Sequence, residues 1–129
     1  MEGIARNLYS SRPPASCVLE VETADEFRDQ VLESHGTTVA LFWATWCPFC
    51  RRFKPSFDQV AAELPWRFAS VTLDDESNPL WDEYAVDVVP TLAWFEDGKL
   101  VDRVDGILGY GLDRSMIDAF VRRVSASTR

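Results

Sequence analysis

The sequence predicts an α/β fold in which a central mixed β-sheet of about five strands is flanked by about four helices. Three observations support this prediction. Apolar runs of strand length alternate with segments of helical periodicity along most of the chain. Asp97-Gly98 separates two strand-like runs, which indicates an antiparallel hairpin late in the chain. Cys47 and Cys50 stand where an apolar run gives way to a helical pattern.

The first part of the chain divides into a lead-in and the start of a domain. Residues 1–15 contain Ser and Pro residues that discourage regular structure, so we expect a flexible lead-in there and one domain over 16–129. Residues 17–21 read as an edge strand. Thr23 and Glu26 have the spacing of a capping box, which predicts a helix that Gly36 ends.

The middle of the chain predicts the centre of the sheet. Residues 39–43 are apolar throughout, as in a strand that is covered on both faces. A helix should begin near Pro48, carry Pro55 within it and stop before Pro65. Further elements are expected at 68–73 (strand), 79–84 (short helix), 91–95 and 99–104 (hairpin strands) and 112–124 (helix). Strands that are joined by helices early in the chain should run parallel, and the late hairpin must be antiparallel.

Composition limits the function. The chain has 129 residues, 47% of them hydrophobic, which suits one compact domain. Its formal net charge is -8, so general binding to nucleic acid or to an anionic membrane is not expected. No apolar run is long enough for a membrane span, and the N-terminus does not resemble a secretory signal. With three cysteines in total, these features favour a cytoplasmic protein over a disulfide-rich secreted one.

The segment Trp46-Cys47-Pro48-Phe49-Cys50 carries the chemistry. A Cys-x-x-Cys turn that opens a helix places the first thiol at the positive end of the helix, which favours its thiolate form. The second thiol lies one turn along and can attack a mixed disulfide that the first has formed. The alternatives are a structural cysteine pair, or a zinc site completed by Cys17 and His35, whose spacing matches no common zinc motif. We therefore expect no metal and no cofactor.

Several motifs in the same order resemble the thioredoxin family over about residues 18–124. They are the segment Phe42-Trp43-Ala44-Thr45-Trp46-Cys47, the helix proline Pro55, the segment Val89-Pro90-Thr91, the turn Asp97-Gly98, and Gly106. The resemblance implies the thioredoxin fold and assigns Cys47 as the nucleophile and Cys50 as the resolving thiol. It implies a substrate-binding surface formed by Trp46, Pro48, Phe49, Val89, Pro90 and Gly106. The peptide bond before Pro90 is then expected to be cis.

Two features depart from the family pattern. Leu41 and Ser70 occupy positions where thioredoxins usually have a buried aspartate and the lysine that pairs with it. The reactivity of Cys50 should therefore depend on water or on the other thiol rather than on a buried carboxylate. In addition, Cys-Pro-Phe-Cys is similar to the glutaredoxin active site, which leaves the electron donor open.

The leading hypothesis is a monomeric cytoplasmic oxidoreductase that reduces disulfide-containing protein substrates. Its expected electron donor is a thioredoxin reductase or another thiol donor. One alternative is a glutathione-coupled, glutaredoxin-like reductase, suggested by Pro48 and Phe49. A second is a non-catalytic adaptor that uses the groove of the fold to hold a partner.

Overall fold

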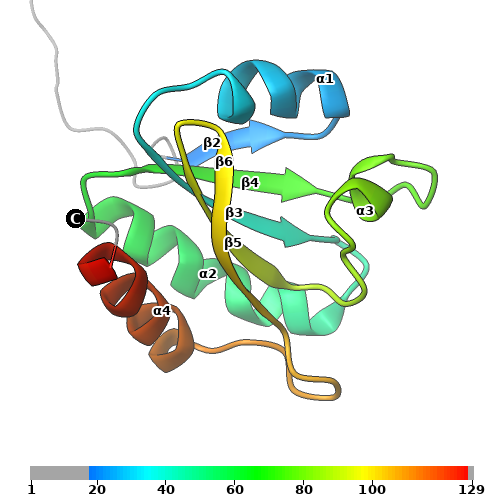
Figure 1. Ribbon diagram of the computed structural model, residues 1–129. Coiled ribbons are helices and arrows are strands. Elements are labelled where there is room, and N and C mark those ends of the chain that lie inside the picture. Colours follow the sequence, from blue (N-terminus) through cyan, green and yellow to red (C-terminus); the bar gives the residue numbers. More distant parts are fainter. Residues whose placement is uncertain (1–17, 128–129) are drawn as a thin grey trace, which may run out of the picture.

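The computed structural model describes residues 18–127 (Figure 1). Its elements, in chain order, are β2 (Val18–Val21), α1 (Ala24–Phe27), the π-helical turn η2 (Arg28–Leu32), β3 (Thr37–Trp43), α2 (Pro48–Glu63), β4 (Arg67–Thr72), α3 (Leu80–Glu83), β5 (Thr91–Glu96), β6 (Lys99–Asp105) and α4 (Arg114–Ser127). With η2 continuing α1, this is the predicted order. The expected lead-in 1–15 and Cys17 lie outside the described residues, and the domain boundary at residue 16 stays a prediction.

Five strands form one mixed sheet in the order β2-β4-β3-β5-β6. Strands β2 and β3 both run parallel to β4, whereas β5 runs antiparallel to β3 and β6 antiparallel to β5. The predicted fold class and the late hairpin are therefore confirmed. Asp97 and Gly98 form the hairpin turn with φ values of 50° and 80°, the left-handed conformation that suits this residue pair.

Helices cover both faces of the sheet (Figure 1). One core cluster joins β3 and β5 to side chains of α2 and α4, among them Phe53, Phe57, Ile117 and Phe120. A second cluster on the other face includes Phe27 and Leu80, from α1 and α3. Along β3, Leu41 belongs to the first cluster and Phe42 to the second. This central strand is apolar at successive positions because both of its faces are buried.

The helix ends differ in part from the predictions. The capping box is confirmed, because Thr23 Oγ1 accepts from Glu26 N at 3.1 Å and Glu26 Oε1 accepts from Thr23 N at 3.2 Å. The first helix ends at Leu32, however, and not at Gly36. It ends in a wider turn, in which Glu33 N donates to Arg28 O at 2.9 Å. Gly36, with φ 84°, lies in the loop that leads into β3.

The last helix begins later than predicted. It starts at Arg114, and Leu112 is buried in the core ahead of it. Asp113 Oδ1 accepts from Met116 N at 3.0 Å, which satisfies a backbone donor of the first turn and fixes the start of the helix. None of the helices within residues 18–127 is long and apolar enough to cross a membrane.

Candidate active site

The two thiols lie at the junction of β3 and α2. Cys47 is the N-cap of α2, with extended backbone (φ -95°, ψ 118°), and its N–H donates to Ala44 O at 3.2 Å. Pro48 occupies the first helical position, where a missing N–H costs no hydrogen bond. The N–H and the hydroxyl of Thr45 both donate to the Asp74 carboxylate at 2.7 Å. These bonds fix the turn that presents Cys47.

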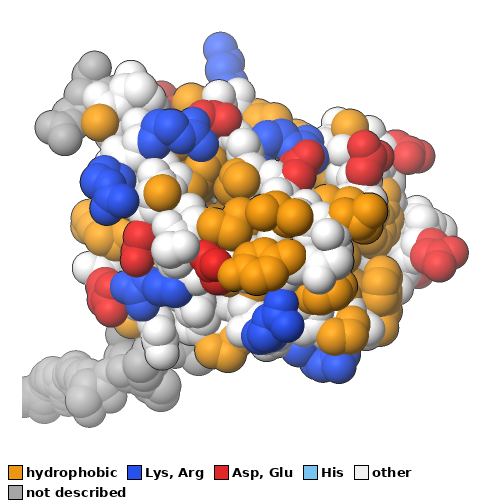
Figure 2. All heavy atoms as spheres, turned by 90° about the horizontal axis from the view of Figure 1, so that it is seen from below, with side chains coloured by type: hydrophobic (Ala, Val, Ile, Leu, Met, Phe, Trp, Pro, Cys, Tyr) orange, Lys and Arg blue, Asp and Glu red, His pale blue; other side chains and the backbone are white. Residues whose placement is uncertain are grey.

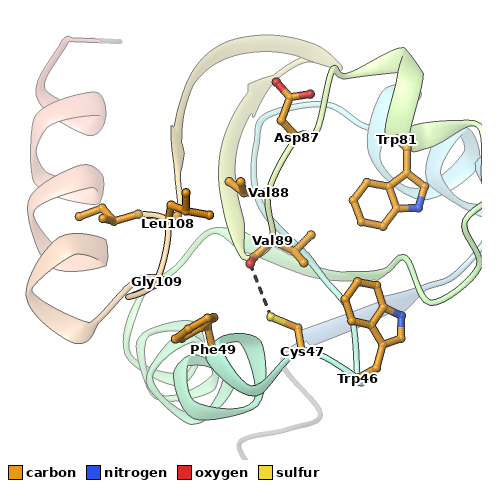
Figure 3. A pocket seen from close by; sticks show the side chains of 11 residues that line it. Trp46, Cys47, Phe49, Trp81, Asp87, Val88, Val89, Leu108 and Gly109 are labelled. Carbon is orange, nitrogen blue, oxygen red and sulfur yellow. Dashed lines mark hydrogen bonds between the residues drawn. The ribbon is translucent and has the colours of Figure 1, made fainter.

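Cys47 faces a groove on the surface. Only 7% of its area is exposed, yet it lines the groove. Its Sγ donates to Val89 O at 3.6 Å, as the dashed line in Figure 3 shows. The Val89–Pro90 peptide bond is cis, as the family resemblance implied. Two segments far apart in the sequence, 46–50 and 88–90, therefore meet at the first thiol.

Cys50 lies behind Cys47 and is fully buried. Burial raises the pKa of Cys50 to about 12, and its hydrogen bond with Cys47 adds to the increase, whereas a backbone hydrogen bond at Ala44 and the charge of Arg51 oppose it. Both thiols are free. Cys50 is therefore held as a protonated thiol near neutral pH, within reach of Cys47.

No carboxylate is buried under Cys50 in the described chain. The buried polar side chains among residues 18–127 are Thr38, Ser70 and Thr91. Leu41 is fully buried in an apolar cluster, and Ser70 Oγ accepts from Trp43 Nε1 at 2.7 Å. The dependence of Cys50 reactivity on water or on the other thiol, rather than on a buried carboxylate, stays a prediction.

The groove beside Cys47 has a volume of about 240 Å³. In Figure 3, Trp46 and Trp81 stand on one side of Cys47 and Leu108 on the other, with Val89 directly above the thiol. Trp46 is 54% exposed and Leu108 is 90% exposed. Figure 2 shows the molecule from below, which is the side on which the 106–111 loop lies in Figure 1. On this face, hydrophobic side chains form a broad area. The apolar lining favours the burial of apolar groups of a bound partner.

The 106–111 loop is seated closely on the site. Gly106 N donates to Pro90 O at 2.9 Å, and a Cβ atom at Gly106 would lie 2.6 Å from that oxygen. At Gly111, where φ is 85°, a Cβ atom would lie 2.8 Å from Cβ of Phe49. Arg52 Nη2 donates to Tyr110 O at 2.6 Å. Glycine at both ends thus allows the loop to form one wall of the groove.

Most of the predicted site residues come together. Trp46, Cys47, Phe49, Val89 and Gly106 line the groove. Pro90 contributes its cis peptide bond and its carbonyl oxygen, whereas Pro48 is exposed on the first turn of α2 and is not among the lining residues.

The groove has further lining residues that the motifs in the sequence do not predict, which are Trp81, Asp87, Val88, Ile107, Leu108 and Gly109. The signal that could have found most of them is adjacency, because they flank Val89 and Gly106 in the chain. Trp81 lies on α3 and has no such signal. Within residues 18–127, no group of three or more His, Cys, Asp or Glu side chains has a geometry that could hold a metal ion.

Cys47 lines a groove, Cys50 is buried behind it, and both lie at the N-terminus of α2. This arrangement defines a thiol–disulfide oxidoreductase of the dithiol type. The Thioredoxin family model matches residues 18–119. The chain belongs to the thioredoxin family.

Individual relatives agree with this assignment. A thioredoxin from Mycoplasmoides gallisepticum is 35% identical over 81 residues, which cover 62% of this chain and 80% of the relative. A bifunctional thioredoxin reductase/thioredoxin from Mycobacterium leprae is 34% identical over 96 residues, 74% of this chain and 21% of that larger protein. The X-ray structure of Fasciola hepatica thioredoxin superposes with a TM-score of 0.68 at 30% identity, covering 81% of this chain and 97% of that one.

Proposed function

We propose that this oxidoreductase reduces disulfide bonds in other proteins, with Cys47 as the nucleophile and Cys50 as the resolving thiol. The observation that carries the assignment is the difference in access between the two sulfur atoms. Cys47 lines the groove, whereas Cys50 is fully buried and hydrogen-bonded to it from behind. A visiting disulfide can meet only the first sulfur, and only the second sulfur can then reach the bond that forms.

The reaction transfers two electrons in two exchanges. The Cys47 thiolate attacks one sulfur of the substrate disulfide, forms a mixed disulfide and releases the other substrate sulfur as a thiolate, which takes a proton from water. Cys50 then gives up its proton, which passes to water or to the departing substrate sulfur, and attacks Cys47 Sγ. The Cys47–Cys50 disulfide forms, and the second substrate thiolate leaves. The substrate is reduced and the protein is oxidised.

Substrate docking is assigned to the segment before Pro90. The backbone N–H of Val89 has no hydrogen bond to any residue between 18 and 127, and the carbonyl oxygen of the same residue accepts from Cys47 Sγ at 3.6 Å. An extended substrate segment can satisfy this donor by pairing with the backbone, a form of strand addition. Trp46, Phe49 and Gly106 then contact the side chains that flank the substrate cysteine, and Pro48 stiffens the turn below them.

A dithiol donor must return the protein to its reduced form. A thioredoxin reductase is the donor that we propose, since one relative combines a thioredoxin reductase and a thioredoxin in a single chain. The cytoplasm supplies the reducing equivalents that this direction needs, and we propose it as the compartment. We also propose that the protein acts as a monomer over a domain of residues 16–129, since residues 46–109 suffice to form the groove that Cys47 lines.

The assignment is tested by turnover of a protein disulfide, such as those of insulin, with a dithiol donor. We expect the wild type to turn over and Cys47→Ser to be inactive. Cys50→Ser should accumulate a mixed disulfide that mass spectrometry detects on Cys47. Cys17→Ser is the matched control and should keep full activity. Equal activity of the wild type and Cys47→Ser would refute the proposal.

A second candidate function rests on the Cys-Pro-Phe-Cys sequence. If the protein is coupled to glutathione, glutathione with glutathione reductase should drive turnover at least as fast as thioredoxin reductase does. Absence of glutathione-driven turnover removes this candidate. A double serine variant of Cys47 and Cys50 that kept its biological activity would instead favour the adaptor hypothesis.

A further inference from the structure

We propose that Asp87 is a specificity-determining residue that favours protein substrates carrying Lys or Arg about two residues from the reactive cysteine. This inference rests on the proposed function, because it concerns the substrate of the same groove. It adds a charge requirement to a site that is otherwise lined mainly by apolar side chains.

Asp87 lies at the end of the groove remote from the thiol. Figure 3 shows Val89 and Val88 between Asp87 and Cys47. Two residues of extended chain span about 7 Å, and side chains two positions apart point to the same side of a strand. A substrate segment that presents its cysteine to Cys47 while paired with Val89 therefore turns a side chain two positions away toward Asp87.

The charge of Asp87 is not neutralised by its own chain. Its exposed side chain has no hydrogen bond or ion pair with any residue in the range 18–127. Arg103, a cation that contacts the preceding residues 84–85, is already engaged. Arg103 of β6 donates to the carbonyl oxygens of Tyr84 and Ala85 and pairs with Asp105 at 2.9 Å. A substrate cation is therefore the available partner for Asp87.

Other charges near the groove do not cancel this preference. Arg51 donates to Thr45 O at 2.9 Å and Arg52 to Tyr110 O at 2.6 Å, and neither arginine lines the groove. Asp87 is the one charged side chain among the described residues that line it. The net charge of -8 acts in the same direction, because it attracts basic partners over longer distances.

The experiment uses one disulfide-linked peptide series in which the residue two positions from the cysteine is Lys, Gln or Glu, placed before the cysteine in one set and after it in another. The ratio of kcat/KM for the Lys and Gln peptides is measured with a dithiol donor at low salt. In at least one set, the wild type should prefer Lys over Gln by about two- to fivefold, the range of an exposed ion pair. Asp87→Asn should bring this ratio to about one, and Asp87→Lys should reverse the order in favour of Glu.

Asp82→Asn is the matched control. Asp82 lies on α3, is exposed and does not line the groove, so this variant has the same change in net charge and should keep the wild-type ratio. An unchanged ratio in Asp87→Asn overturns the inference, as does an equal loss of the ratio in Asp82→Asn. If the wild type reduced none of the peptides, the proposed function itself would fail. Reduction of all of them without a charge preference would refute only the role of Asp87.

Discussion

Trp43 Nε1 donates a 2.7 Å hydrogen bond to Ser70 Oγ, across the neighbouring strands β3 and β4. Leu41 is the register partner of Ser70, and both side chains are buried. The region of the sheet under the active-site helix is therefore held by a neutral hydrogen bond and apolar packing rather than by a buried charge. This neutral arrangement leaves water or the departing substrate thiolate to accept the proton of Cys50.

We predict that Ser70→Ala lowers the free energy of unfolding by about 1–2 kcal/mol, because it leaves the Trp43 N–H without its acceptor. Urea denaturation followed by tryptophan fluorescence measures the loss. Ser56→Ala in α2 is the control. Its hydroxyl has no hydrogen bond to any described residue, so this variant should be as stable as the wild type or slightly more stable. A neutral effect of Ser70→Ala would show that the bond contributes nothing.

The raised pKa of Cys50 predicts how stability depends on pH. The thiol stays protonated in the folded protein up to about 12, whereas the ordinary value for a thiol is 9.0. The folded protein therefore binds more protons than the unfolded chain between these values, and stability falls as pH rises through this window. The contribution of the protonated Cys50 thiol to the free energy of unfolding is fully present below pH 9.0.

The measurement compares the reduced wild type with Cys50→Ala. The difference between their unfolding free energies should be constant below about pH 8.5 and should then shrink by up to ~1.4 kcal/mol per pH unit. Lys and Tyr residues titrate in both proteins and cancel in the difference. A difference that stays level up to pH 10.5 would contradict the burial of a neutral thiol.

Two glycines of the 106–111 loop, Gly109 and Gly111, should respond differently to a methyl group. Gly109 and Gly111 have similar φ values, 81° and 85°, but only Gly111 faces Phe49 closely. We predict that Gly109→Ala loses about 1–2 kcal/mol from backbone strain alone. Gly111→Ala should lose a further 1–3 kcal/mol, roughly, because Phe49 must move. Chemical denaturation of both variants measures the difference in the free energy of unfolding. Equal losses in the two variants would show that Phe49 moves aside at no measurable cost.

Arg103 should stabilise the segment that precedes Val89. Its guanidinium donates to the carbonyl oxygens of Tyr84 and Ala85, and Ala85 has a φ of 49°. We predict that Arg103→Met raises the hydrogen-exchange rates of the hydrogen-bonded amides at 84–86 by about ten- to a hundredfold, since bonds to a charged donor contribute roughly 1.5–3 kcal/mol. Arg122→Met is the control, because the Arg122 side chain has no hydrogen bond or ion pair to residues 18–127. Unchanged exchange in Arg103→Met would exclude this role.

Much of the fold follows from local patterns in the sequence. The apolar run of β3 predicts a strand that is covered on both faces, and Asp97-Gly98 predicts its own turn. The π-helical turn at the end of the first helix was not predictable. Whether Glu33 bonds to Arg28 or to the residue after it depends on packing against the sheet, which the hydrophobic period does not record.

The candidate site was predictable only in part, for a similar reason. The thiols, Val89 and Pro90 stand in motifs that resemble a known family, and the structure brings them together. Trp81 and Leu108 stand in no motif. They reach the groove because four separate segments of the chain, at 46–49, 81, 87–89 and 106–109, meet there, and no local sequence pattern predicts this.

In the 106–111 loop, the residues that fix its position differ from the residues whose side chains are exposed. Gly106 and Gly111 fix its distance from the sulfur atoms, whereas the side chains of Ile107 and Leu108 project outward, 54% and 90% exposed. Replacing those two outward side chains leaves both anchor points untouched. Because both side chains also line the groove, we expect their exchange to change which client proteins are reduced while Cys47 and Cys50 stay in place.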